Sequence, residues 1–472
     1  MDLTPSAAGH AGPTRADRLA LGILLAAMPL LWLPAAWTPF WGDDYHYLSG
    51  AHLANEAGTP WLTTFWPEQP LYFWRPLSQE AWWRVVEGVL GGDVRLAHAA
   101  LLVFHALAAI AVGLLARTLA RACAWRDAGT IAALAAMLYG VLALHLLPVH
   151  WVAAANSPLL VLFSALAMAA WLAAGQAAGA RQALLAVATP PLLALALLSK
   201  ESAVLAPVLM VVLSIFAGRR PGRAQVLAWV ACLAVAAAWL ALRARATGAP
   251  APEYAYAFGG NLVRNTASLC AWLLNVPREA LRMLATGATA AGAAWAAAAA
   301  LPVLVGLGLA VRGGVSRLTP RQWLLLPVAV GIAYAPYLPL QWNSYAYYAA
   351  VAAIVPAIAL ARLLAGRRVA PVVALLLAVS SAIAVEGTRR LDHPGLLGRA
   401  RWAESTLREL ERQSPRPPLS VVVEDEQRFY AIGGAGLAWR LGLAPGDVRR
   451  VAACPQEGAC LQVRADGSWR LD

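Results

Sequence analysis

The chain is divided into long apolar runs, and this pattern limits its fold more than any other feature. A transmembrane helix needs about 20 mostly apolar residues. Candidate spans lie at residues 19–37, 96–116, 131–147, 158–174, 184–198, 203–217, 226–242, 290–311, 323–338, 345–364 and 369–385. Charged residues make up only 13% of the chain, against about 25% in soluble domains. The sequence therefore predicts an all-α polytopic membrane protein with about eleven transmembrane helices.

The ends of these runs predict how the chain enters and follows the membrane surface. Arg15 and Arg18 precede the first run, which lacks a small-residue cleavage site and is therefore interpreted as an uncleaved anchor. A polar, tryptophan-rich segment occupies residues 38–93. Residues 261–284 are amphipathic and broken by Pro277, which predicts a helix lying on the outer interface.

The arginines predict the orientation. They are denser in the short loops that would face the cytoplasm, which places the N-terminus inside and, with an odd number of spans, the C-terminus outside. The net charge of +12 therefore reflects loop placement and not a nucleic-acid groove. Abundant alanine and the preference for arginine over lysine are typical of a GC-rich bacterial genome, so we expect a multi-pass protein of a bacterial cytoplasmic (inner) membrane.

The last part of the chain is polar and is predicted to be a separate periplasmic unit. We expect a transmembrane domain over residues 1–386 and a small α/β domain over 387–472. A helix is predicted at 396–412, strands at 419–423 and near 460–464, and a turn at Gly433, Gly434 and Gly436. Cys454 and Cys460 are close enough to form a disulfide in an oxidising compartment, or they remain two free thiols.

Two adjacent carboxylates, Asp43 and Asp44, follow the first span. Such residues are costly near lipid unless they bind something. They could hold a divalent cation such as Mg²⁺ or Mn²⁺, or one could act as a general base. The alternatives are a solvated loop start or a helix N-cap formed by Asp43 or Asp44.

The same outer segment contains Arg75-Pro76-Leu77, followed by Glu80 and the pair Trp82-Trp83. Proline at the first turn would begin a helix along the interface, with Arg75 at its N-terminal edge. The two tryptophans are interpreted as membrane-interface anchors.

Lys200 is the only lysine in the chain, in the segment Ser199-Lys200-Glu201 at the outer end of an apolar run. Its retention in an arginine-rich sequence suggests that a compact ammonium is needed there, and the alternative is a turn in which Lys200 and Glu201 neutralise each other. Further outer arginines that run against the orientation rule include Arg243, Arg245 and Arg264. A phosphate would explain these positive charges, and ordinary surface arginine is the alternative.

Histidines and tyrosines complete the set of candidate residues. His98 and His105 share one helix face, and His150 stands at an outer turn; hydrogen-bonded structural histidines are favoured for all three. The segment 341–348, which includes Tyr345, is rich in hydroxyls and aromatic rings, which suit both the interface and sugar stacking.

The serial order of these motifs resembles the GT-C superfamily of polytopic glycosyltransferases, and particularly its protein O-mannosyltransferase-like members. The matching segments are Trp41-Gly42-Asp43-Asp44, Arg75-Pro76-Leu77, Pro148-Val149-His150, Ser199-Lys200-Glu201 with Pro207, and, more loosely, 345–348. The resemblance covers residues 15–365. It does not extend to a tetratricopeptide tail or to the C-terminal domain.

The resemblance implies transfer of a sugar from a polyprenyl-phosphate donor, with inversion, at the outer membrane face. It implies that an aspartate of the first outer loop, Asp43 or Asp44, is the base toward an acceptor that is a protein, lipid or glycan. Lys200, Arg243, Arg245 and Arg264 are then expected to bind the donor phosphate. Arg75, His150, Glu201 and Tyr345 are further site candidates.

Two other functional classes are weighed against this one. A transporter or flippase for a lipid-linked sugar predicts ionisable residues within the spans and paired half-repeats, and neither pattern is evident. A non-catalytic membrane scaffold would require neither Asp43-Asp44 nor Lys200.

Overall fold

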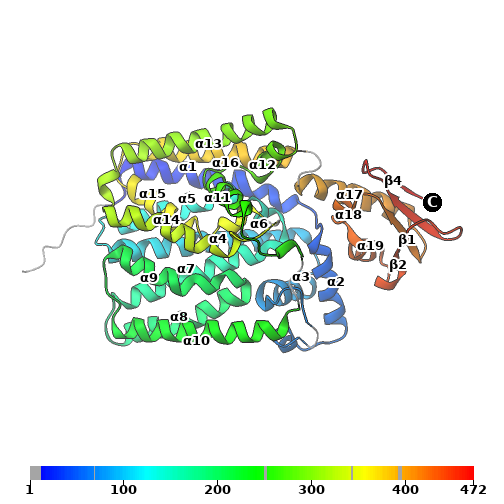
Figure 1. Ribbon diagram of the computed structural model, residues 1–472, viewed down its shortest axis with the longest axis horizontal. Helices are drawn as coiled ribbons and strands as arrows, with labels where there is room; N and C mark the ends of the chain where they lie inside the picture. The colour runs from blue at the N-terminus through cyan, green and yellow to red at the C-terminus, as the bar shows by residue number, and fades with distance from the viewer. Residues whose placement is uncertain (1–11, 68–69, 249–251, 342–343, 392–395) are drawn as a thin grey trace, which may run out of the picture.

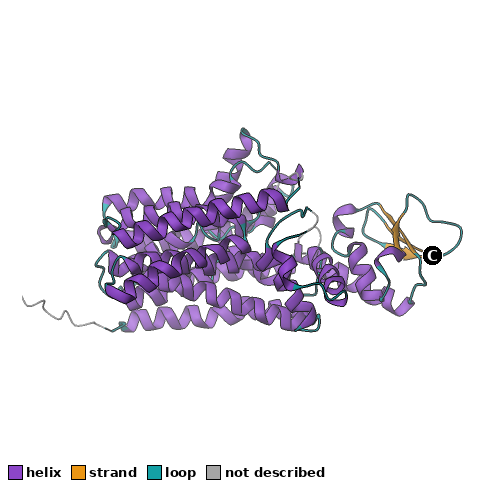
Figure 2. Ribbon diagram, turned by 90° about the horizontal axis from the view of Figure 1, so that it is seen from below, coloured by secondary structure: helices purple, strands orange, loops and turns teal. Residues whose placement is uncertain are grey.

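The computed structural model describes residues 12–67, 70–248, 252–341, 344–391 and 396–472. It consists of a long helical bundle with a small mixed domain at one end (Figures 1 and 2). Helix α1 begins at the opposite end of the bundle from that domain (Figure 1).

Nineteen α-helices are found in the described residues. Their bounds are α1 Arg15–Trp32, α2 Asp43–Glu56, α3 Trp82–Gly88, α4 Val94–Ala122, α5 Ala128–Gly140, α6 Leu146–His150, α7 Asn156–Ala174, α8 Gly179–Ser199, α9 Ala206–Ala217, α10 Arg223–Ala246, α11 Gly260–Leu273, α12 Arg278–Ala285, α13 Thr289–Arg312, α14 Pro320–Tyr334, α15 Ile354–Leu364, α16 Ala370–Arg390, α17 Leu396–Gln413, α18 Glu426–Phe429 and α19 Gly433–Leu441.

The all-α membrane architecture predicted from the sequence is confirmed, with a difference in helix length. Seven helices are long and apolar enough to cross a membrane, or eight if α5 and the bent segment Ala143–His150 form one span. The predicted runs at 203–217, 323–338 and 345–364 contain the shorter helices α9, α14 and α15.

These three helices are shortened at the same end of the bundle. Each gives way to a 3₁₀ turn at the end of the bundle that faces the C-terminal domain: Glu201–Leu205 before α9, Ala335–Tyr337 after α14 and Ala346–Ala349 before α15. These turns present polar and aromatic side chains at that end. Irregular backbone at membrane depth is tolerated only where protein or a water-filled cavity surrounds it.

Local sequence explains where several helices begin and how they pack. Thr14 and Asp17 form a reciprocal capping box at the start of α1, and Asp93 caps α4 through the amides of Arg95 and Leu96. Gly113 of α4 lies so close to α5 that a Cβ there would stand 2.9 Å from the Ala132 carbonyl oxygen. The interior of the bundle is therefore packed through small residues.

The outer segment between α1 and α4 folds back on the bundle instead of lying on its surface. Pro76–Ala81 forms a turn of π-helix that continues into α3, as the proline predicted. The assignment of Trp82 and Trp83 to the membrane interface is wrong, because they are only 6% and 1% exposed. Trp82 packs on Phe104 and Trp83 on Tyr47, because this segment closes one end of the bundle.

The predicted break at Pro277 is confirmed, since it separates α11 from α12. Pro277 lies just before the first residue of α12, where its missing N–H costs nothing. The side chains of Trp342 and Asn343, which belonged to the predicted turn at 341–348, lie outside the described residues.

The C-terminal domain is a four-stranded sheet with helices, as expected for an α/β unit. Its strands are β1 Leu419–Val423, β2 Val448–Arg450, β3 Ala459–Val463 and β4 Trp469–Leu471, in the order β2-β1-β3-β4. Strand β1 pairs in parallel with β2 and β3, and β4 is antiparallel to β3. A disulfide joins Cys454 to Cys460.

One element of this domain differs from the prediction. Gly433, Gly434 and Gly436 belong to helix α19 and do not form a turn. Gly433 has a φ of 60°, which glycine adopts at little cost and which redirects the chain into the helix. Gly436 faces Tyr45 of α2, and a Cβ there would lie 2.8 Å from the tyrosine ring. Close packing against the bundle thus explains Gly436, and backbone conformation explains Gly433.

Candidate functional site

The end of the bundle that carries the C-terminal domain contains a cavity of about 860 Å³. Its wall comes from α2, the segment 59–84, the turn before α7, two tyrosine-bearing turns and the C-terminal domain. The polar and aromatic lining residues are Asp43, His46, Tyr47, Thr59, Thr63, Thr64, Tyr72, Phe73, Arg75, Gln79, Glu80, Trp83, Arg84, Trp151, Asn156, Tyr254, Tyr345, Tyr347 and Tyr430. The cavity is therefore rich in hydroxyls, rings and charges of both signs.

Asp43 is the predicted base that faces this cavity. It occupies the first turn of α2, where the helix dipole favours a carboxylate. Its Oδ1 accepts a hydrogen bond of 2.5 Å from the hydroxyl of Tyr430, and no hydrogen bond to its Oδ2 is found among the described residues. Burial raises the pKa of Asp43, and the Tyr430 hydrogen bond and the charges of His46 and Arg75 oppose that rise.

Asp44 is turned away from the cavity, although it is the next residue. Its side chain is completely buried, and its two oxygens accept hydrogen bonds from the amides of Trp41 and Ala153, at 3.1 and 2.7 Å. Burial raises the pKa of Asp44 well above its usual range. This carboxylate ties the start of α2 to the turn Val152–Ala155 and does not line the cavity.

Arg75, which is buried, and Glu201, which is half-buried, form an ion pair between segments that are distant in the sequence. Nε and Nη2 of Arg75 donate to the two carboxylate oxygens of Glu201 at 2.8 and 2.6 Å. Burial alone would raise the pKa of Glu201, but the Arg75 guanidinium lowers it to about 2. No hydrogen bond from Arg75 Nη1 is found among the described residues, and Arg75 lines the cavity. The pair therefore holds a guanidinium at the cavity wall with one donor nitrogen uncommitted.

Lys200 lies in a box of aromatic rings behind the cavity wall. Its Nζ is 4.5 Å from the ring centre of Tyr347, 4.8 Å from that of Tyr348 and 5.6 Å from that of Tyr337. Lys200 is 2% exposed, and burial together with the nearby Arg75 lowers its pKa to about 7. Lys200 is not among the described residues that line the cavity. Tyr347 both contacts Lys200 and lines the cavity, so its ring separates the two.

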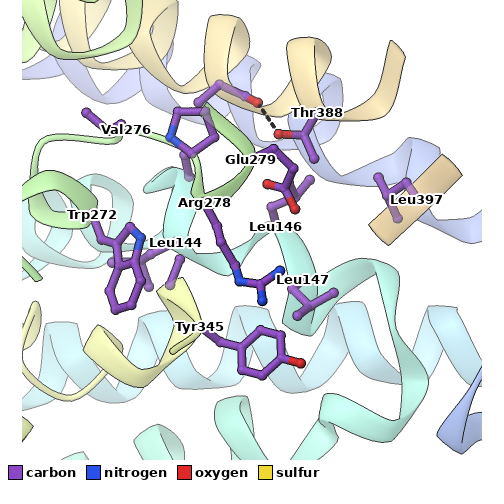
Figure 3. Close-up of a pocket in the computed structure, with 14 residues that line it drawn as sticks. Leu144, Leu146, Leu147, Trp272, Val276, Arg278, Glu279, Tyr345, Thr388 and Leu397 are labelled. Carbon is purple, nitrogen blue, oxygen red and sulfur yellow. Dashed lines mark hydrogen bonds between the residues drawn. The ribbon is translucent and has the colours of Figure 1, made fainter. Parts of the chain in front are cut away.

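Tyr345 connects the large cavity to a second, apolar pocket. Figure 3 shows this pocket, of about 30 Å³, lined by Leu144, Leu147 and Trp272 with Arg278 at one side. The Arg278 guanidinium stands 4.4 Å from the centre of the Tyr345 ring, and its Nε donates to the Ser344 carbonyl. Tyr345 thus packs against a cation and also lines the large cavity.

The other predicted phosphate ligands are not brought to this cavity. Arg245 lines a neighbouring groove of about 210 Å³, which shares Pro67 with the cavity. Arg243 lies over the Trp239 ring, and Arg264 donates to the Gln341 carbonyl. These three side chains are separated from the cavity because α10 and α11 present them to other surfaces.

The predicted histidines are structural in their contacts. His150 is 1% exposed and its Nδ1 bonds to the Leu146 carbonyl. The rings of His98 and His105 likewise bond to backbone carbonyls, of Val149 and Gly140. None of the three lines the large cavity.

Sequence reasoning missed several residues of the cavity wall. His46 and Tyr47 stood in the motif beside Asp43 but received no role, and Glu80 was considered only as part of an interface segment. Helical spacing could have placed Asp43, His46 and Tyr47 on one face of α2. Burial raises the pKa of Glu80. Tyr430 could not have been found, since no pattern relates it to Asp43.

The expected metal site at Asp43 and Asp44 gains no support from further ligands. Within the described ranges, no group of three or more His, Cys, Asp and Glu side chains is placed to hold a metal ion. The two carboxylates also have different partners, Tyr430 for Asp43 and backbone amides for Asp44. They do not form one shared ligand pair.

No family model matches the chain, and no curated protein matches it either. Among solved structures, the fold is similar to that of ArnT from Cupriavidus metallidurans, which was crystallised bound to undecaprenyl phosphate. The two sequences are 16% identical, the match covers 94% of this chain and 93% of that chain, and the TM-score is 0.39.

Proposed function

We propose that this chain is a membrane glycosyltransferase, which moves a sugar from a polyprenyl-phosphate donor to an acceptor hydroxyl in the large cavity. The observation that carries the proposal is the convergence of motifs that are far apart in the sequence. Trp41 stacks on Trp151 at 5.0 Å, Arg75 pairs with Glu201, and Lys200 lies against Tyr347 and Tyr348. These contacts bring the segments of the GT-C resemblance around one cavity.

Asp43 is the base in this proposal. The acceptor O–H gives its proton to Asp43 Oδ2 while the acceptor oxygen attacks the anomeric carbon of the sugar. A new C–O bond forms as the bond from that carbon to the phosphate oxygen breaks, with inversion at the carbon. Burial favours this role because it raises the pKa of Asp43 toward working pH, where a base is more effective.

Arg75 is the group best placed to stabilise the departing phosphate. The electron pair of the broken bond stays on the lipid-phosphate oxygen, and a guanidinium in a partly dry site stabilises such charge. Glu201 fixes the guanidinium plane by its two hydrogen bonds and leaves Nη1 for the ligand. Lys200 adds positive charge one ring farther away, behind Tyr347.

The proposed orientation places the cavity outside the cytoplasmic membrane. The C-terminal domain contributes Tyr430 to the cavity wall and contains a disulfide, a bond that persists in oxidising compartments. Arginine placement in the loops supports the same orientation. The donor lipid and the acceptor would then meet at the periplasmic face of the bacterial inner membrane.

The test is sugar transfer by the purified chain in liposomes, with radiolabelled hexose or pentose on undecaprenyl phosphate as donor and isolated bacterial membranes as the acceptor source. Asp43→Asn should lower the rate by about 10²–10⁴-fold, because the amide cannot take the proton. Asp93→Asn is the matched control, since asparagine also caps a helix well and Asp93 is outside the cavity. Full transfer by a folded Asp43→Asn protein would refute the assignment.

A further inference from the structure

The C-terminal domain docks on the start of helix α2 through several close contacts. The Gly42 amide donates to the Ala431 carbonyl at 2.8 Å. Gly436 of α19 packs on the Tyr45 ring, and the ring of Trp439 meets that of His52 edge-on at 5.4 Å. The backbone of α2 next to Asp43 is therefore bonded directly to the C-terminal domain.

Gly42 makes this approach possible. It has a φ of 61°, a conformation that side-chain-bearing residues rarely adopt. A Cβ at this position would lie 3.0 Å from the ring of Tyr430. Glycine is thus required both by the backbone turn before α2 and by the tyrosine ring that packs on it.

We infer that Tyr430 is a positioning residue for Asp43, so that the C-terminal domain completes the catalytic site of the transmembrane domain. The inference rests on the proposed function for its catalytic meaning. The Tyr430 hydroxyl donates to Asp43 Oδ1 at 2.5 Å, and this bond fixes the rotation of the carboxylate. The other oxygen, Oδ2, is then held toward the cavity, where the acceptor hydroxyl would lie.

The bond also sets the basicity of the carboxylate. A hydrogen bond to the charged form lowers the pKa of an acid, and Tyr430 acts on Asp43 in this direction. Removing the hydroxyl should therefore raise the pKa of Asp43. The other titratable groups that act on or respond to Asp43 are Asp44, His46, Tyr47, Arg75 and Tyr254. Tyr430→Phe leaves all of these in place.

Tyr430→Phe and the control Tyr45→Phe form a matched pair. Tyr45 is in the same contact between α2 and the C-terminal domain, where its hydroxyl interacts with Arg440. It does not line the cavity. Both variants lose one hydroxyl from the same interface, but only one loses the contact with Asp43.

The first measurement does not depend on sugar transfer. A water-soluble carbodiimide modifies protonated carboxyls, so the pH dependence of Asp43 modification, read by mass spectrometry, reports its pKa. In Tyr430→Phe the midpoint should move to higher pH, and in Tyr45→Phe it should stay at the wild-type value. An unchanged midpoint in Tyr430→Phe would overturn the inference even if Asp43 is the base.

The second measurement is transfer against pH, in the assay described above. Tyr430→Phe should lower kcat by about tenfold with little change in the KM for the donor, and should move the acid limb of the profile to higher pH. Wild-type kcat and pH profile in Tyr430→Phe would contradict the positioning role. A failure of the proposed function would give a different result. Asp43→Asn would then show full transfer, while the shift of the carbodiimide midpoint in Tyr430→Phe would still be observed.

Gly42→Ala provides a second variant at the same contact. Its Cβ would press on the Tyr430 ring and strain the turn, so it should displace the hydroxyl from Asp43. We expect the same upward shift in the midpoint of Asp43 modification as in Tyr430→Phe. A folded Gly42→Ala protein with a wild-type midpoint and wild-type kcat would count against the inference.

Discussion

Two regions of the molecule contain the same kinds of polar residue but use them differently. The cavity wall, represented by Asp43 and Arg75, has charged groups that each keep an oxygen or nitrogen without a hydrogen bond among the described residues. The layer behind it, represented by Asp44 and Lys200, contains groups whose surroundings are fully occupied by protein. Direction of the side chain, and not residue type, separates a candidate catalytic group from a structural one.

The Asp43–Asp44 pair shows this difference within a single helical turn. Adjacent residues of a helix point about 100° apart, because there are 3.6 residues per turn. One carboxylate therefore meets the cavity and the other meets the backbone amides of Trp41 and Ala153. A motif of two acids does not by itself provide two catalytic acids.

The largest effect on stability is expected from the ion pair between Arg75 and Glu201. Glu201→Gln leaves the buried Arg75 guanidinium without its compensating carboxylate, and an uncompensated buried charge costs about 3 kcal/mol. The unfolding midpoint in detergent should fall accordingly. Glu409→Gln, which disturbs an exposed pair with Arg412, is the control and should leave the midpoint unchanged. Equal midpoints for both variants would mean that the Arg75–Glu201 pair is not rigidly buried.

A smaller effect is expected from the buried carboxylate. Asp44→Asn leaves one of two backbone amides without an acceptor, at a cost of about 1–3 kcal/mol. The yield of folded protein should fall, while the transfer rate per folded molecule stays near that of wild type. Asp43→Asn should show the opposite behaviour. If Asp44→Asn folds normally and loses transfer, then Asp44, not Asp43, belongs to the chemistry and the comparison fails.

A pH-dependent effect on stability is expected at Lys200. Its pKa in the folded protein is lowered from 10.5 to about 7, so the unfolded chain binds the extra proton between these values. Stability should therefore rise with pH from about 7 to about 10.5. Lys200→Arg stays charged and Lys200→Gln stays neutral across this range, so both variants should lose this rise. Thermal unfolding at pH 6 and pH 9 measures both.

The same variants test the predicted phosphate role of Lys200. Stabilisation by added undecaprenyl phosphate should weaken above pH 7 in the wild type, as the ammonium loses its proton, and persist in Lys200→Arg. If stabilisation by undecaprenyl phosphate is independent of pH and of residue 200, the phosphate is held by the cavity wall alone.

Most of the fold could be predicted from the sequence because the solvent of this protein is lipid. Apolar runs of sufficient length must become helices there, since each backbone polar group has to be satisfied within its own segment. That rule located the helices but not their lengths at the cavity end. The 3₁₀ turns before α9, after α14 and before α15 depend on neighbours that a linear pattern does not contain.

Part of the candidate site could be predicted from the sequence for a similar reason. Asp43, Arg75, Glu201 and Tyr345 could be singled out because a charged or ring-bearing residue beside an apolar run needs an explanation. Arg243, Arg245 and Arg264 satisfied the same criterion but face other surfaces. Composition near the membrane therefore marks candidates and cannot choose among them.

The sequence by itself determined that the chain is polytopic and helical and that its last part is polar. It also showed that the single lysine and the acidic pair stand at the outer ends of apolar runs. Only the tertiary structure decided which acid faces the cavity, that Lys200 is enclosed by tyrosines, and that Tyr430 reaches Asp43 from the C-terminal domain. The physical reason is the distance along the chain over which each interaction acts. Bilayer crossing is enforced segment by segment, whereas a hydrogen bond between residues 43 and 430 exists only after two domains have packed together.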